Sequence, residues 1–198
     1  MASFLGYQYV TPVSVNSNQP HFTTDTLNLK RTSAVSTAQR WEMEVQLGPD
    51  STGTLQAALQ AHRTVNGFHT AFDIPIYQHH GLVASRGVQS IDVNVATPVN
   101  SNTVEVMSQA PVTIPAGYYI KFSNHSKVYL VTETFTLNDP TPANISIFPR
   151  LREAVTTTDT LETDGIMMRA KYDVSDLIGY TYTRGIVTRA TVSVVEDV

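Results

Sequence analysis

The stretch between residues 115 and 149 limits how this chain can fold more than any other part of the sequence. Tyr118, Ile120 and Phe122 form a row at every second position, which is the spacing of a β-strand with one buried face. The short polar run 124–126 then supplies a turn, and two more alternating segments follow it, separated by a proline-containing loop. We therefore expect an antiparallel hairpin and a further strand, within a small sheet or barrel.

Two strands outside this stretch show the same alternation. From Trp41 to Leu47 every second residue is large and apolar, and from Ile186 to Val195 apolar residues again share one face. One face of each strand is expected to join a core, and the other to meet water, a channel or a neighbouring subunit. The polar positions on this second face, which we predict as candidate subunit-interface residues, are Glu42, Glu44, Gln46, Thr191 and Ser193.

One segment has the spacing of an amphipathic helix. Leu55, Leu59 and His62 fall on one side of it, and Asp50 or Ser51 is expected to cap its first turn. An Asn-Gly pair closes it. Two further strands are predicted from weaker patterns, over Phe22–Leu29 and Phe68–Tyr77.

The order of these elements predicts two interleaved domains. Five short strands are expected between residues 88 and 149, enough for a small closed barrel of the OB type. The polar segment 150–165 is interpreted as a return linker. The two strands after it are too few to be stable alone, so they should complete the first sheet. We therefore predict a discontinuous domain, 1–87 and 156–198, interrupted by an inserted domain, 88–155.

Composition and charge exclude several classes of protein. Charged residues make up 15% of the chain, against roughly 25% in average soluble domains, and low charge suits a protein that buries surface in an assembly. The net charge of -4 does not favour a specific grip on phosphates. Without cysteine there is neither a disulfide nor a thiolate metal site. No secretory signal and no apolar run of roughly 20 residues is present, so we expect folding in the cytoplasm and no membrane association.

The sequence lacks the short motifs typical of catalytic centres, such as a G-x-S-x-G elbow, a phosphate loop or a zinc-protease helix. We expect no enzymatic activity, no cofactor and no metal. The pair His79–His80, with His62 and His69 upstream, is the strongest metal alternative, but adjacent side chains diverge in extended backbone. Glu42 and Glu44 could form a glycosidase pair, although a wet or ring-facing acidic edge is the favoured interpretation.

The turn of the hairpin contains a small cluster of basic residues. His125 lies between Lys121 and Lys127, and such a cluster could bind an anion or a sugar. The favoured interpretation is a turn in which Asn124 and Ser126 satisfy local backbone groups.

Several segments carry a resemblance to a known family. The run AGYYIKFSNHSKVY (116–129) joins a strand to a turn and ends in His-x-Lys-Val-Tyr. Further segments are AQRW (38–41), ISIFPRL (145–151) and ATVSVVE (190–196). Together and in this order they resemble the distal tail proteins of T-five-like siphophages. The first forty residues match only in general character, and the connector with His79–His80 is not aligned.

The resemblance implies a mainly β protein: a tail-tube-like sandwich or barrel domain with one α-helix, interrupted by an inserted OB-like barrel. Six copies would form a homohexameric ring at the distal end of a phage tail tube, with the tube protein above and baseplate hub or fibre proteins below. Genome DNA would pass through the lumen without specific binding. Lys121, His125, Lys127 and Tyr129 would be structural residues of the family hairpin. The protein would be a virion component of the tail tip, assembled in the host cytoplasm.

Two alternatives stay open. A ring or collar protein of a contractile-tail baseplate would use the same fold. A carbohydrate-binding module is a different class, because OB-like barrels often bind oligosaccharides. In that case a face bearing Tyr119, Lys121 and Tyr129 could stack on a sugar and donate hydrogen bonds to it.

Overall fold

The chain folds into a β-rich structure with one helix. The computed structural model describes residues 3–25, 31–35, 38–50, 52–76, 90–138, 141–173, 179–183 and 186–197. Within these ranges the elements are β1 (Ser3–Phe4), β2 (Tyr7–Asn18), β3 (His21–Asp25), β4 (Arg31–Val35), β5 (Arg40–Leu47), α1 (Thr54–Asn66), β6 (Phe72–Pro75), β7 (Ile91–Val93), β8 (Thr103–Ser108), β9 (Val112–Ile114), β10 (Tyr119–Phe122), β11 (Val128–Val131), β12 (Phe135–Leu137), β13 (Ala143–Phe148), β14 (Thr160–Glu162), β15 (Met167–Tyr172), β16 (Gly179–Thr183) and β17 (Ile186–Glu196). The prediction of a mainly β protein with one helix and a small barrel is confirmed.

The first and last parts of the chain together build one large sheet. Its strand order is β1-β2-β5-β17-β15-β6, with β16 paired to β17, and every neighbouring pair is antiparallel. The pairing of β5 with β17 joins residues far apart in sequence, such as Val45 opposite Val192. The last strands are thus stabilised by the sheet that the first strands begin.

The alternation in β5 places one face of the sheet in a core. The four large apolar residues of β5 are all buried, and helix α1 packs Leu55 and Leu59 into the same core. Asp50 accepts hydrogen bonds from the backbone amides of Leu55 (2.5 Å) and Thr52 (2.9 Å), so it satisfies the first turn of the helix from a position before the N-cap. No helix in the described ranges has the length and apolar character needed to span a membrane.

The middle of the chain forms a closed barrel with the strand order β10-β11-β13-β8-β7-β14. Its interior holds the apolar residues at alternate positions of these strands, among them Ile120 and Phe122 of the predicted hairpin. β9 and β12 pair with each other and add Ile114 and Leu137 to the same core. This small barrel is compatible with the OB-like prediction.

The barrel extends past the limit predicted at residue 155. β14 lies between β10 and β7, so the segment interpreted as a return linker supplies one of the strands of the closed barrel. The barrel therefore has six strands rather than the five expected. Because β14 is only three residues long and lies in a polar segment, it produces no visible alternation in the sequence.

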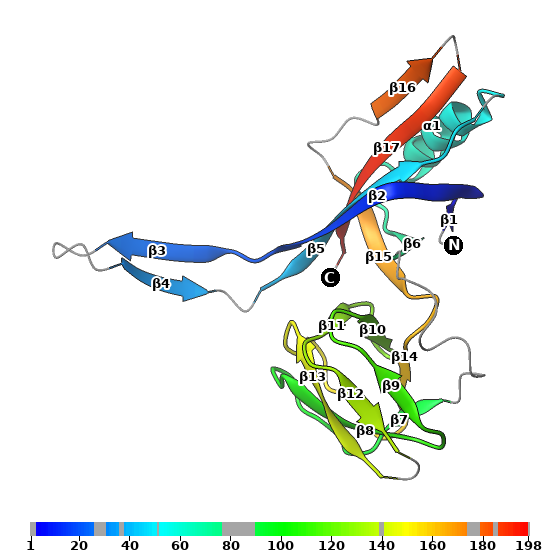
Figure 1. Cartoon of the computed structure of the whole chain (residues 1–198). Coiled ribbons are helices and arrows are strands. Elements are labelled where there is room, and N and C mark those ends of the chain that lie inside the picture. Colours follow the sequence, from blue (N-terminus) through cyan, green and yellow to red (C-terminus); the bar gives the residue numbers. More distant parts are fainter. Residues whose placement is uncertain are drawn as a thin grey trace.

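A two-stranded ribbon projects from the sheet. β3 and β4 pair with each other, from His21 opposite Val35 to Asp25 opposite Arg31. Figure 1 shows this ribbon extending away from both the sheet and the green and yellow barrel. The prediction for this region placed a strand over Phe22–Leu29. The structure ends β3 at Asp25, and residues 26–30 lie outside the described ranges.

One strand was not predicted, and one predicted strand begins later than expected. β4, with the sequence RTSAV, was not predicted because it contains no apolar alternation. The strand predicted over Phe68–Tyr77 begins only at Phe72, because the chain is still turning after the C-terminus of α1, where Gly67 has a positive φ of 56°.

Candidate functional site

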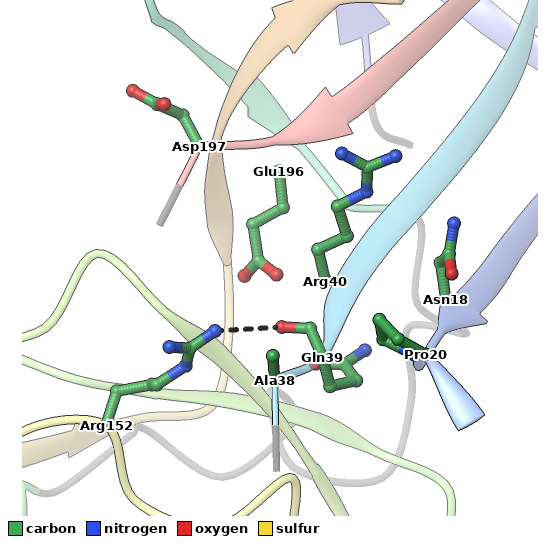
Figure 2. Close-up of a pocket in the computed structure, with 8 residues that line it drawn as sticks. All are labelled: Asn18, Pro20, Ala38, Gln39, Arg40, Arg152, Glu196 and Asp197. Atoms are coloured by element: carbon green, nitrogen blue, oxygen red, sulfur yellow. Dashed lines mark hydrogen bonds between the residues drawn. The ribbon is translucent and has the colours of Figure 1, made fainter. Parts of the chain in front are cut away.

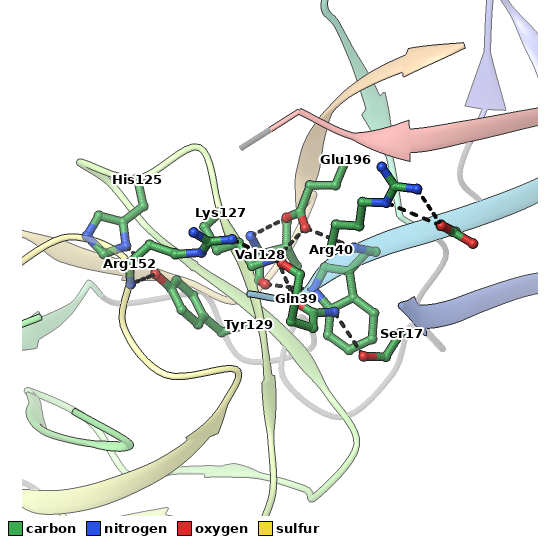
Figure 3. Close-up of polar contacts among 11 residues, drawn as sticks. Ser17, Gln39, Arg40, His125, Lys127, Val128, Tyr129, Arg152 and Glu196 are labelled. Carbon is green, nitrogen blue, oxygen red and sulfur yellow. Dashed lines mark hydrogen bonds and ion pairs between the residues drawn. The ribbon is translucent and has the colours of Figure 1, made fainter. Parts of the chain in front are cut away.

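A cluster of buried polar side chains lies where the barrel meets the sheet (Figure 3). Lys127 precedes β11 of the barrel, Glu196 ends β17, and Gln39 precedes β5. All three are at most 5% exposed. The Lys127 ammonium forms an ion pair with Glu196 and also donates to Gln39 Oε1 (2.7 Å) and to the Gln39 carbonyl oxygen (3.1 Å). An ammonium group has three donors, so all of them have partners.

The Glu196 carboxylate also binds the backbone of both domains. Its Oε2 accepts a hydrogen bond from the Trp41 amide in β5 (3.0 Å), and its Oε1 accepts one from the Val128 amide in β11 (3.0 Å). In turn, Trp41 Nε1 donates to the Val128 carbonyl oxygen (2.8 Å). The N–H and the C=O of Val128 are therefore both fixed to the sheet domain. We call Gln39, Trp41, Lys127, Val128 and Glu196 the junction cluster.

Aromatic contacts surround the junction cluster. The Trp41 ring meets Tyr119 edge-on at a centroid distance of 5.5 Å and Phe148 at 6.1 Å. Val128 belongs to the core of the sheet, and Tyr119, Leu130 and Phe148 pack against the same core. The outer surface of the barrel strands thus completes the core of the sheet, and a continuous apolar interface joins the two domains.

Burial raises the free-energy cost of keeping both members of the ion pair in the junction cluster charged. Desolvation lowers the pKa of Lys127, whereas the charge of Glu196 favours the ammonium form and opposes this shift. Removing one partner from such a pair leaves the other charge buried and unpaired, which costs about 3–5 kcal/mol. The pair therefore penalises any docking of the barrel that separates Lys127 from Glu196.

A second set of buried contacts holds the hairpin turn to the loop after β13. The Tyr129 hydroxyl accepts a hydrogen bond from the Arg152 amide (3.1 Å) and lies 2.8 Å from His125 Nδ1. Burial raises the pKa of Tyr129 to about 12, so the hydroxyl keeps its proton and can donate it to this ring nitrogen. Burial also lowers the pKa of His125, which favours the neutral imidazole that accepts this bond.

The structure places the four predicted hairpin residues in different environments. His125, Lys127 and Tyr129 are buried, whereas Lys121 is half-buried and its ammonium lies 3.4 Å from the Met167 carbonyl oxygen. The ammonium groups of Lys121 and Lys127 bond different elements, and Lys127 is engaged inside the protein. They do not converge on an anion or a sugar in the turn.

The face proposed for sugar binding does not exist as predicted. Cross-strand pairing sets Tyr119 opposite Leu130 and Ile120 opposite Tyr129. Tyr129 therefore shares the interior of the barrel with Ile120, while Tyr119 faces outward and packs on Trp41. The prediction put Tyr129 on the face of Tyr119 and Lys121, and the register of the two strands shows that this was wrong.

The predicted interface residues lie side by side on the face of the sheet opposite the core. β5 and β17 pair Glu44 with Ser193 and Gln46 with Thr191. Glu44 is exposed, and Glu42, Gln46, Thr191 and Ser193 are half-buried. Glu42 accepts hydrogen bonds from Asn18 (2.6 Å) and Arg40 (3.2 and 3.3 Å).

The histidines considered as metal ligands are not gathered in the part of the chain that the structure describes. His62 Nδ1 lies 2.7 Å from the Tyr172 hydroxyl in an aromatic cluster with Phe4 and Phe72, and His69 is exposed. His79–His80 lies outside the described residues. Across the described ranges no three His, Asp or Glu side chains are placed to share a metal ion.

A cavity of about 500 Å³ opens beside the junction cluster (Figure 2). We call it the junction cavity. Its polar lining consists of Asn18, Gln39, Arg40, Arg152, Glu196 and Asp197. Arg152 comes from the loop that follows the last long strand of the barrel, and the others belong to the sheet domain. A molecule bound here would touch both domains.

Sequence reasoning missed Glu196 and Gln39 as site residues. The signal for Glu196 was present, because Ala190, Val192 and Val194 are buried at alternate positions and Glu196 continues the same row. A charged residue in phase with an apolar row indicates a buried partner. Gln39 gave the same signal in a weaker form, because it precedes β5 but lies in phase with the buried row that starts at Trp41.

Comparison with known proteins found no family model that matches the chain and no match among curated proteins.

Proposed function

We propose that this chain is a structural subunit of a phage tail, forming a homohexameric ring at the distal end of the tail tube and passing DNA through its lumen. The observation that carries the proposal is the β3–β4 ribbon. Within the described residues its two strands pair only with each other, and an isolated two-stranded ribbon is marginally stable in water. A neighbouring copy would supply the missing strand or surface.

The junction cluster suits such a role because it makes the barrel a fixed attachment. The ion pair and the Val128 hydrogen bonds join the barrel to β17 and β5 of the sheet, so the barrel would keep one position on every subunit of a ring. All five of its residues lie in the segments that resemble the distal tail proteins: Gln39 and Trp41 in 38–41, Lys127 and Val128 in 116–129, and Glu196 at the end of 190–196. In this proposal the family hairpin motif serves domain docking.

The polar face of β5 and β17 suits a channel through which DNA slides. Its candidate positions, among them Glu44, Thr191 and Ser193, supply no Lys or Arg to hold phosphates; of the two arginines on the same face, Arg40 is bonded to Glu42 and Arg189 is exposed. Placing arginine at positions 44 and 193 should then create salt-sensitive DNA binding by the assembled protein. Glu133→Arg, at an exposed barrel position, is the matched control and should add less binding. Equal DNA binding by both variants would show that this face does not line the channel.

Native mass spectrometry of the full chain at rising concentration tests the ring. We expect hexamers in the intact protein. A variant in which a short Gly-Ser turn replaces the ribbon between Asn18 and Ala38 should stay monomeric with its single tryptophan still buried. Hexamers that survive loss of the ribbon would show that assembly depends on another surface.

A further inference from the structure

We propose that the junction cavity is a binding site for a singly charged carboxylate, carried by an acidic side chain of a partner protein, with the Arg152 guanidinium as its main contact. The cavity volume of about 500 Å³ lies within the range of about 300–1,000 Å³ that is usual for ligand sites. This site does not depend on ring formation.

The acidic groups that line the cavity are already neutralised. Glu196 pairs with the buried ammonium of Lys127. Asp197 pairs with Lys171 at 2.7 Å. Neither carboxylate therefore needs a further cation from a ligand, and neither is the partner of Arg152.

Arg152 is the basic group of the cavity that is left without a carboxylate. Arg152 is exposed, and among the described residues its guanidinium makes one long hydrogen bond, 3.4 Å from Nη2 to the Gln39 carbonyl oxygen, while none of the ion pairs between described residues involves it. Arg40 differs, because both its Nε and its Nη2 bond Glu42. Figure 2 shows the Arg152 guanidinium pointing toward Gln39 across the boundary between the domains.

An anion at Arg152 would also relieve an unfavourable interaction between Arg152 and Lys127 of the junction cluster. Burial is the main cause that lowers the pKa of Lys127, and the positive charge of Arg152 adds a smaller contribution in the same direction. A carboxylate beside Arg152 would offset this repulsion and hold the barrel against the sheet more firmly. Binding should therefore raise the stability of the folded chain as well as occupy the cavity.

The lining selects a carboxylate over a phosphate. A guanidinium presents two parallel N–H donors that match the two oxygens of a carboxylate. Among the described lining residues, Arg152 is the one cation without a carboxylate partner, so its single charge matches one carboxylate and leaves a dianion only half compensated. A single glutamate or aspartate side chain therefore fits the local charge better than a phosphoryl group.

Nuclear magnetic resonance titration of the full chain tests the site. The probe is a capped pentapeptide with two glutamates separated by glycines, and its control has glutamine at both positions. Sodium acetate and inorganic phosphate are titrated separately. We expect saturable shifts of the Arg152 Nε–H and Gln39 side-chain amide signals with the glutamate peptide. The glutamine peptide, acetate and phosphate should each bind more weakly.

Substitutions decide whether Arg152 is the contact. Arg152→Gln should weaken binding of the glutamate peptide at least about tenfold, and Arg152→Lys should weaken it less because the charge remains. Arg150→Gln removes an exposed arginine outside the cavity lining and should leave binding unchanged. Unchanged binding in Arg152→Gln, equal binding of the glutamine peptide, or tighter binding of phosphate would each overturn the site. Acetate binding as tight as the peptide would overturn its assignment to a protein segment.

Discussion

Lys127 and Glu196 form a buried ion pair across the boundary between the barrel and the sheet. One residue lies in the hairpin that dominates the sequence pattern, and the other ends the last strand. Their side chains are 2% and 0% exposed, so the pair works in a medium that hardly screens it. The ion pair gives Lys127 a structural role in a hairpin that has no catalytic features.

Breaking the ion pair from the acidic side should destabilise the chain strongly. Glu196→Gln leaves the Lys127 ammonium buried without a counter-charge, and we expect a loss of about 3–5 kcal/mol in the free energy of unfolding. The double variant with Lys127→Met should recover part of this loss, because it removes the stranded charge. Urea unfolding of the two single variants and the double variant measures the coupling.

The control for this cycle is an ion pair near the surface. Lys171→Met breaks the ion pair between Lys171 and Asp197. Because these two side chains are 35% and 32% exposed, we expect a loss of less than about 1 kcal/mol in the free energy of unfolding. Equal losses for Glu196→Gln and Lys171→Met would contradict the role given to burial.

Trp41 is the single tryptophan of the chain and reports on the junction directly. Its ring is 3% exposed and contacts Tyr119 and Phe148 of the barrel, so its fluorescence should be blue-shifted and weakly quenched by acrylamide. Glu196→Gln removes the charged anchor of Val128, and quenching should increase before global unfolding. Quenching that stays at the wild-type value until the whole chain unfolds would show that the domains do not separate.

Asp50 should make the stability of the helix region depend on acid pH. Hydrogen bonds from Thr52 and Leu55 lower its pKa from the ordinary value of 3.8. A lowered carboxyl pKa stabilises the fold above the unfolded value, and this contribution is lost as pH falls through the folded value. The stability advantage of wild type over Asp50→Ala should therefore be constant near neutral pH and shrink below about pH 4. An advantage that does not change down to pH 2 would contradict the shift.

His125 should lose its stabilising role at a higher pH than Asp50. Burial lowers its pKa from 6.5, so the unfolded chain takes up the proton first as pH falls. The contribution of neutral His125 is complete above pH 6.5 and declines below it. The stability advantage of wild type over His125→Gln should follow this course, and the imidazole Cε1–H signal should titrate below 6.5. A midpoint above 6.5 would place a charged imidazole in the barrel.

The sequence predicted several strands with a visible alternation, but not the 12-residue β2. β5, β10 and β17 each bury one face, and a buried face imposes a period of two; β11 buries Val128 in the core of the sheet and Tyr129 and Val131 in the barrel. β4 and β14 were missed because pairing with a neighbour defines them and their own side chains do not alternate in hydropathy. The partners of β14 lie far away in the sequence, whereas β4 pairs with the preceding strand β3.

The junction was only half predictable for the same reason. The row Ala190, Val192, Val194 and Glu196 shows that Glu196 must be buried, but it does not show which cation meets it. The position of Tyr129 depends on register, since shifting the pairing by one residue would exchange the interior and exterior of β11. Neither the partner of a buried charge nor the register of a hairpin can be read from the local sequence, because both depend on tertiary contacts.

Cryo-electron microscopy of the full-length chain at high protein concentration tests the proposed ring. The expected result is a closed ring of six subunits with an open lumen, in which each β3–β4 ribbon contacts the next subunit and each barrel keeps the position set by Lys127 and Glu196. Particles that remain monomeric at every concentration, or that close with a different symmetry, would contradict it.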